Sequence, residues 1–78
     1  MIVHSPEELA LMVRNYRKQA KISQAKAGDL VGMKQTTLSA FENKPDSTKL
    51  DTLFRVLAAV NLEVHVVPRG SVKWDEEW

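Results

Sequence analysis

Apolar residues recur at helical spacing along most of the chain, and capping signals divide them into four stretches. The first begins after Ser5, which suits a helix cap, at Pro6, which suits a first helical position, and Glu8 completes a capping box. We expect one apolar stripe on this helix to face the core of a helical domain. Its members are Leu9, Met12, Val13, Tyr16 and Ala20.

Two short helices with a glycine between them are predicted next. Ser23 caps a helix over residues 24–31 that ends at Gly32, and a third helix follows over residues 34–43. Two short helices joined through a glycine have the layout of a helix-turn-helix, whose second helix enters the major groove of DNA. The inward residues of the third helix are Leu38 and Phe41.

After a fourth helix, the period of the pattern changes. The fourth helix is expected over residues 48–60, and Leu62 to Val66 then alternate between apolar and polar, which is typical of a half-buried strand. Pro68 ends this segment. The expected inward residues of the fourth helix are Leu50, Leu53, Phe54 and Leu57.

The length of the chain, 78 residues, suits one domain. We expect a DNA-binding and dimerisation domain over residues 1–70 and a flexible acidic and aromatic tail over residues 71–78. The chain has no cysteine and no apolar run near the ~20 residues of a membrane span. These features indicate a soluble cytoplasmic protein, associated with the nucleoid if it binds DNA.

The small net charge of +1 hides an uneven distribution. Residues 14–49 carry eight basic and three acidic side chains, a net +5, whereas residues 1–13 and residues 50–78 each carry a net −2. A basic middle suits a polyanion such as DNA, although a solvated lysine-rich face would show the same charge.

The third helix offers a surface that suits base recognition. Opposite its buried side lie small or polar residues, so this helix can approach base edges closely, and lysine and glutamine are side chains that read guanine and adenine. The predicted base-reading residues are Lys34, Gln35, Thr36 and Ser39. The predicted phosphate contacts, which position the protein without specifying sequence, are Ser23, Gln24, Lys26, Thr37, Asn43 and Lys44.

A homodimer is expected from two features of the C-terminal third. Val56 and Val60 widen the apolar arc of the fourth helix beyond an ordinary amphipathic stripe, and the strand has no second strand in the chain to pair with. Pairing with a second copy about a two-fold axis satisfies that strand, and an extended arm packed on its own domain is the alternative. The predicted dimer contacts are Val56, Val60, Leu62, Val64 and Val66.

The segments Ile22-Ser23-Gln24 and Gly32-Met33-Lys34-Gln35-Thr36-Thr37-Leu38-Ser39-Ala40-Phe41-Glu42-Asn43 resemble the helix-turn-helix of the phage-repressor-like (XRE/Cro) family. This resemblance implies an all-α, four- to five-helix repressor-like domain that acts as a dimer on a palindromic operator. The one short C-terminal strand pairing across the homodimer is implied by the narrower resemblance described next. The family resemblance also implies that Arg17 and Glu42 tie the first helix to the third. Gly28 departs from the family pattern, which allows either close contact with the third helix or a mobile second helix.

Within this family the whole layout resembles the HipB-like antitoxins, through Lys34 to Ser39, Phe41 to Asn43, Pro45-Asp46 and a final Glu77-Trp78. The resemblance implies a repressor of its own operon that neutralises a HipA-like serine/threonine kinase toxin, with Trp78 as the toxin contact. The alternatives are a repressor without a toxin and a module that binds protein only. We expect neither catalysis, nor a metal, nor a cofactor, because His4 and His65 have no catalytic or ligand neighbours in the sequence.

Overall fold

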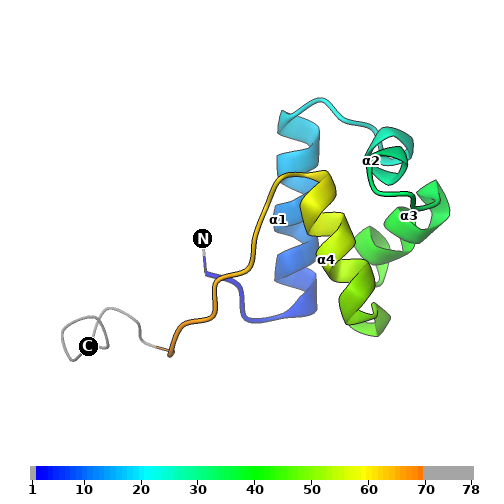
Figure 1. Cartoon of the computed structure of the whole chain (residues 1–78). Helices are drawn as coiled ribbons and strands as arrows, with labels where there is room; N and C mark the ends of the chain where they lie inside the picture. Colours follow the sequence, from blue (N-terminus) through cyan, green and yellow to red (C-terminus); the bar gives the residue numbers. More distant parts are fainter. Residues whose placement is uncertain (1, 70–78) are drawn as a thin grey trace.

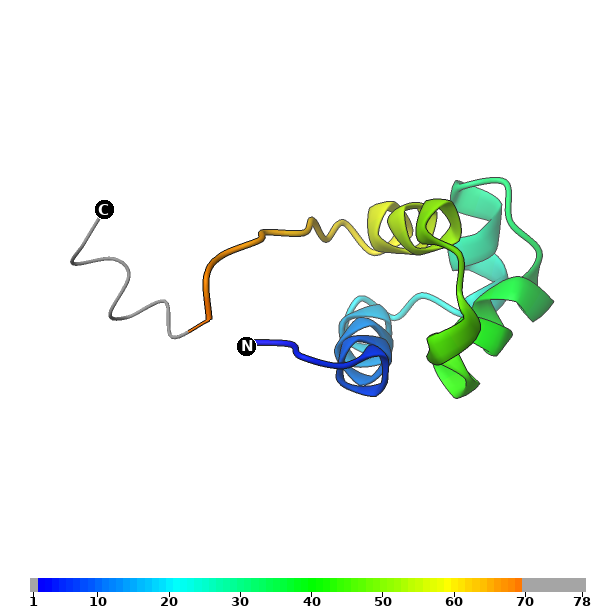
Figure 2. The same cartoon turned by 90° about the horizontal axis from the view of Figure 1, so that it is seen from below.

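The computed structural model describes residues 2–69, which form four α-helices and one turn of 3₁₀-helix. In chain order these are α1 (Pro6–Gln19), α2 (Gln24–Leu30), α3 (Gln35–Asn43), η1 (Pro45–Ser47) and α4 (Leu50–Ala59). Figures 1 and 2 show α1 and α4 on one side of the helical body and α2 and α3 on the other, and α3 contacts both α2 and α1. The predicted all-α fold is confirmed.

Local signals account for where the helices begin. The Ser5 hydroxyl accepts a hydrogen bond from the Glu8 backbone N–H, and the Ser23 hydroxyl accepts one from the Lys26 N–H, so both serines cap as predicted. The expected capping box differs in one detail, because the Glu8 carboxylate accepts from the N–H of His4 and not from that of Ser5.

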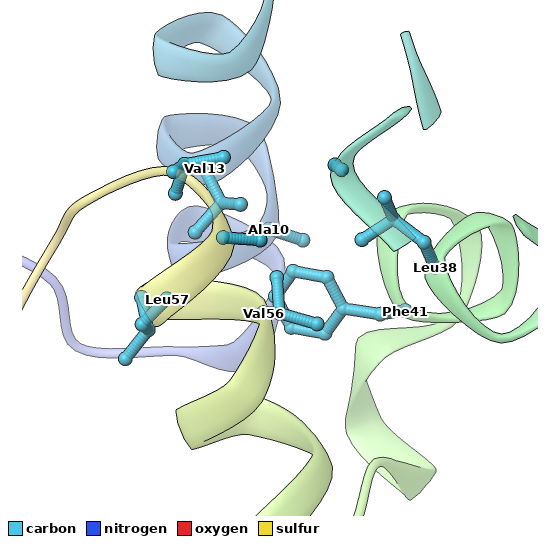
Figure 3. Packing of buried hydrophobic residues seen from close by; sticks show 9 residues of the cluster. Ala10, Val13, Leu38, Phe41, Val56 and Leu57 are labelled. Carbon is cyan, nitrogen blue, oxygen red and sulfur yellow. The ribbon is translucent and has the colours of Figure 1, made fainter. Parts of the chain in front are cut away.

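The core lies where α1, α3 and α4 meet. Figure 3 shows the Phe41 ring of α3 directed at Val56 of α4 and toward α1, which carries Ala10 and Val13. Leu38 and Phe41 are buried as predicted. The full set of buried apolar residues is Ala10, Val13, Ala27, Leu38, Phe41, Val56, Leu57, Ala59 and Val60.

The inward face of α1 differs from the predicted one. Tyr16 and Ala20, which were expected in the stripe, are exposed, and Arg17, which was not part of it, is buried. The stripe is therefore rotated about the helix axis, because Arg17 satisfies its charge inside the protein and so does not need solvent. Leu9 and Met12 are partly buried.

The inward face of α4 is also rotated. Leu50 and Phe54 were expected inside, but they are 71% and 56% exposed, while Leu53 is half-buried and Leu57 is buried. Val56, with no exposed surface, takes the central position. The helix is amphipathic as predicted, with its buried arc centred on a different residue.

Residues 62–69 form an arm that leaves α4 after Asn61, whose φ of +59° turns the chain. Figures 1 and 2 show this arm passing α1 and running away from the helical body. Within residues 2–69 no segment is paired as a strand, so the predicted pairing of the arm has no partner in a single chain and stays a prediction.

Candidate nucleic-acid interface

The turn between α2 and α3 depends on two glycines. Gly32 has a φ of +66°, a left-handed conformation that only glycine adopts without strain. Gly28 allows α2 to approach the turn closely, because a Cβ atom there would lie 2.3 Å from the Met33 carbonyl oxygen. The Met33 N–H donates to the Gly28 carbonyl at 2.8 Å. Of the two possibilities open for Gly28, the structure therefore shows the close contact.

A buried ion pair fixes α3 to α1. Arg17 Nε donates to Glu42 Oε2 at 2.6 Å, and Arg17 Nη2 donates to Glu42 Oε1 at 2.9 Å. Arg17 Nη1 also donates to the Ile22 carbonyl at 2.9 Å, which ties in the loop before α2. The two side chains are 9% and 3% exposed. The predicted pairing of Arg17 with Glu42 is confirmed, and its two-pronged geometry is the arrangement arginine favours with a carboxylate.

Glu42 stays ionised in this environment. Burial alone raises the pKa of this carboxyl, but hydrogen bonds from Arg17 and Gln24 and the positive charges of Arg17 and Arg14 outweigh that effect. The pKa of Glu42 is therefore below its usual value. The charge on Glu42 is maintained throughout the neutral range, and α3 stays attached to α1.

Hydrogen bonds continue from this ion pair to the start of α3. Gln24 Nε2 donates to Glu42 Oε1 at 3.0 Å, and Gln35 Nε2 donates to Gln24 Oε1 at 2.6 Å. Gln35 keeps its carbonyl oxygen and one N–H free, which are the two groups that a glutamine offers to adenine. A predicted phosphate contact, Gln24, thus also holds a predicted base-reading side chain.

The other predicted base-reading residues share the outer side of α3. Lys34 precedes the helix as its N-terminal cap residue, and Lys34 and Thr36 are exposed. Ser39 is half-buried, and its hydroxyl accepts a hydrogen bond from Asn43 Nδ2 at 3.2 Å. Four side chains that were predicted to read bases therefore lie on one short helix and its cap.

Predicted phosphate contacts flank this helix. Ser23, Lys26, Asn43 and Lys44 are exposed, and Thr37 is half-buried. Because the Ser23 oxygen accepts from the Lys26 N–H, the hydroxyl proton of Ser23 is left to donate to an anion.

Two lysines line a small open hollow of about 170 Å³ between α3 and the start of α4. They are Lys44, which was predicted as a phosphate contact, and Lys49, which was not. The charge of Lys49 is evident in the sequence, but only the packing of η1 places it beside Lys44. The hollow is otherwise lined mainly by hydroxyl groups, those of Thr37, Ser47, Thr48 and Thr52.

Two residues that were predicted as dimer contacts are buried inside a single chain. Val56 is fully buried and Val60 is 9% exposed, so both belong to the core of one chain and neither widens an exposed apolar arc. The large apolar residues that α4 does expose are Leu50 and Phe54, which continue around the helix from Leu53 and Leu57. An apolar face is present, as expected, but different residues form it.

The arm and α4 border an apolar groove of about 730 Å³. Its walls include Leu9 and Met12 of α1, Leu53 and Leu57 of α4, and residues 62–69 of the arm. Residues 2–4 of the N-terminal segment also line it. Val64 and Val66, both predicted dimer contacts, are 46% and 91% exposed beside this groove.

Other predictions concern parts of the chain or chemistry outside this surface. Trp78, the predicted toxin contact, lies outside the described residues. Among residues 2–69 no helix is both long and apolar enough to cross a membrane. The same residues hold no cluster of three or more histidine, aspartate or glutamate side chains placed to bind a metal.

Comparison with known proteins agrees with this geometry. A family model described as HTH_3, helix-turn-helix, matches residues 13–66. Antitoxin HipB from two strains of Escherichia coli is 33% and 32% identical to the chain, over 97% of this chain and 87% and 93% of those proteins.

Solved structures of HipB are similar in three dimensions. A HipB complex with a 20mer of O4 and a HipA–HipB–O2–O3 complex each superpose with a TM-score of 0.86 at 33% identity. Each match covers 88% of this chain and 97% of the other.

Proposed function

The chain belongs to the HTH_3 helix-turn-helix family and, within it, to the HipB antitoxins, and from this premise we propose that it is a sequence-specific DNA-binding repressor and antitoxin. It binds operator DNA of its own toxin–antitoxin operon and neutralises a HipA-like kinase. The alternative of a repressor without a toxin is less well supported, because the relatives are antitoxins along nearly their whole length.

One observation carries the DNA-binding part of this proposal. The hydrogen-bonded chain Arg17–Glu42–Gln24–Gln35 runs from the buried core to the exposed start of α3. A side chain that is held before binding loses less conformational entropy when it meets a base. The network therefore suits Gln35 to reading DNA and not only to making contact with solvent.

We assign base reading to the start and outer side of α3. Lys34 donates to guanine O6 and N7, and Gln35 pairs with adenine through its free oxygen and N–H. Thr36 and Ser39 are small enough to let the helix lie deep in the major groove. Ser23, Gln24, Lys26, Thr37, Asn43 and Lys44 contact phosphates and fix the register, and the position of Lys49 beside Lys44 adds it to this set.

We propose that the operator-binding form is a homodimer. Leu62, Val64 and Val66 of the arm contribute to the interface, and Leu50 and Phe54 take the place first given to Val56 and Val60. A two-fold dimer places the two α3 helices in successive major grooves, about one helical turn apart, which is why the operator is palindromic.

The toxin-binding part of the proposal uses the tail. Residues 1–70 form the DNA-binding and dimerisation domain, and residues 71–78 supply a toxin contact at Trp78, because tryptophan is a frequent anchor of protein interfaces. The protein acts by binding and has no catalytic role or cofactor. We place it in the cytoplasm, at the nucleoid, where its operator lies.

The base-reading assignment is tested with a duplex from the promoter of the protein's own operon and a scrambled duplex of the same composition. Lys34→Ala should lose about 1–3 kcal/mol of binding free energy on the promoter duplex and little on the scrambled one. Lys26→Ala and Lys44→Ala serve as matched controls, which should weaken both complexes alike and reduce the slope of log K against log salt by about one each. Equal losses on both duplexes for Lys34→Ala would refute its role in base reading.

The toxin assignment is tested by copurification of the tagged chain from its native cells. We expect a HipA-like kinase to be retained by the full chain and lost when Trp78 is deleted, while affinity for the promoter duplex is unchanged. Recovery of DNA without a kinase would indicate that the protein is a repressor with no toxin partner. Retention of the kinase by the shortened chain would keep the antitoxin function and exclude Trp78 as its contact.

A further inference from the structure

Three helices of the domain end in the same backbone conformation, but α1 does so with an unusual residue. After α1, α2 and α4 the chain passes through one residue with a positive φ, which is Lys21 at +59°, Gly32 at +66° and Asn61 at +59°. Glycine adopts this left-handed region freely and asparagine tolerates it, whereas the Cβ atom makes most other residues avoid it. Lys21 is therefore strained at a place where the other two helices carry a suitable residue.

Hydrogen bonds fix this conformation at the end of α1. The Lys21 N–H donates to the Lys18 carbonyl at 3.0 Å, and the Ile22 N–H donates to the Arg17 carbonyl at 3.1 Å. These two bonds form the Schellman motif that closes many helices, in which the left-handed residue is usually glycine. The motif uses only the backbone of Lys21, so the lysine side chain is not needed to close the helix. A strained residue that the fold nevertheless retains is a reason to look for a function of its side chain.

Lys21 lies in a strongly basic stretch of the chain. Residues 14–28 carry five basic side chains and no acidic one. Arg17 is paired with Glu42, but Lys18, Lys21 and Lys26 form no ion pair with any of residues 2–69. All three of these lysines are exposed. Positive charge that the protein itself does not compensate attracts a polyanion.

Position 21 is close to two of the predicted phosphate contacts. Ser23 and Gln24 follow two and three residues later, and two trans peptide units span at most ~7.6 Å between the Cα atoms of Lys21 and Ser23. Arg17 fixes this loop, because its Nη1 donates to the Ile22 carbonyl at 2.9 Å. Figure 1 shows the loop leading from the end of α1 into α2. Lys21 is thus held at the edge of the surface assigned to DNA.

We propose that Lys21 binds a phosphate of the DNA backbone next to the phosphates contacted by Ser23 and Gln24. The strained conformation persists because it places a cation at that point, and Lys18 in the last turn of α1 adds to the positive charge there. This inference rests on the proposed DNA binding and extends the contact surface from α2 to the end of α1. A lysine recognises a phosphate by its charge and reads no base, so it strengthens binding to any sequence.

Three substitutions separate the charge of Lys21 from its backbone conformation. K21M removes the charge and keeps the strain, K21G removes both, and K21R keeps both. We expect K21M and K21G to bind the promoter duplex and the scrambled duplex each at least about threefold more weakly than the parent chain. The slope of log K against log salt should fall by about one for each chain bound. K21R should stay within about twofold of the parent on both duplexes, because it retains the charge.

Thermal unfolding tests the strain without DNA. K21G and K21M both lack the charge, so any favourable interaction of a cation with the C-terminal end of α1 is absent from both. Because only glycine adopts the left-handed conformation freely, K21G should unfold a few degrees above K21M. A K21G chain that unfolds at or below the temperature of K21M would overturn the claim that a side chain at position 21 is strained.

The outcomes that contradict the phosphate contact differ from those that contradict the proposed function. Unchanged affinity and salt slope for K21M would overturn the contact, and a loss on the promoter duplex alone would mean that Lys21 reads a base. A K21M chain that binds both duplexes like the parent but no longer copurifies with the kinase would assign Lys21 to a protein partner instead. A parent chain that binds neither duplex would refute the proposed DNA binding itself.

Discussion

Glu42 shows how one residue serves both folding and recognition. It accepts two hydrogen bonds from Arg17 inside the protein and one from Gln24, which in turn holds Gln35. Taking two charges out of water is costly, and this geometry offsets that cost by satisfying the guanidinium and the carboxylate together. Gln24 thus links Glu42, the side chain that anchors α3, to Gln35, the side chain proposed to read a base.

Replacing Glu42 with glutamine tests this role. Glu42→Gln leaves the Arg17 charge buried without its counter-ion, and we expect a loss of about 3–5 kcal/mol in the free energy of unfolding at pH 7. Urea denaturation measures it. Glu7→Gln, on the exposed first turn of α1, is the control and should change stability by less than about 1 kcal/mol.

The way the free energy of unfolding falls at acid pH should also differ between the parent chain and this variant. Because the pKa of Glu42 is lower in the folded chain, its contribution is complete above the pKa of an unfolded glutamate, about 4.3, and is lost as pH falls through the lower native value. The Glu42→Gln variant should therefore lose less stability than the parent as the pH falls below the pKa of an unfolded glutamate, about 4.3. Parallel profiles for the two chains would show that Glu42 does not contribute through its charge.

At the scale of elements, the contact between α2 and the turn decides how α3 is presented. The helix-turn-helix packs closely because Gly28 has no Cβ to meet the Met33 carbonyl. Glycine lowers intrinsic helix stability by about 1 kcal/mol relative to alanine, so α2 gives up local stability for this approach. The close approach of α2 to the turn sets the position of α3 relative to α2.

Gly28→Ala should therefore be destabilising although alanine is the better helix former. The new Cβ would lie 2.3 Å from a backbone oxygen, so the turn has to shift, and we expect a loss of about 1–3 kcal/mol. Ala25→Gly, at an exposed position of the same helix, is the matched control and should lose about 1 kcal/mol through propensity alone. Denaturation at equal protein concentration compares them, and a stabilised Gly28→Ala chain would contradict the close packing.

At the scale of the whole molecule, one chain leaves more apolar surface exposed than its core accounts for. Leu50 and Phe54 of α4 and Val66 of the arm are each more than half exposed. A chain of this size buries a small core, and association is a common way to add to it. Folding and assembly are therefore expected to be coupled, with a thermal midpoint that rises with protein concentration.

Phe54→Ser tests the dimer face without touching the core. Because the side chain is proposed to be buried twice in a symmetric dimer, we expect the dissociation constant to rise at least about tenfold while the helical content of the monomer persists. Leu11→Ser is the matched control: Leu11 is 53% exposed against 56% for Phe54, and it lies on α1 and not on the exposed face of α4. Sedimentation velocity separates the two, and a dimer weakened by Leu11→Ser but not by Phe54→Ser would place the interface on α1.

The sequence alone determined the helical class, the positions of the helix caps and the helix-turn-helix, because these depend on local spacing and on single residues such as Ser23 and Gly32. The family resemblance added the pairing of Arg17 with Glu42. Which side of α1 and α4 faces inward was decided only by the tertiary structure, in which Arg17 and Val56 are buried and Tyr16 and Phe54 are exposed. The physical reason is that apolar residues cover more of these helices than a small core can bury. Periodicity marks every side that can be buried, and the packing of the other helices selects one.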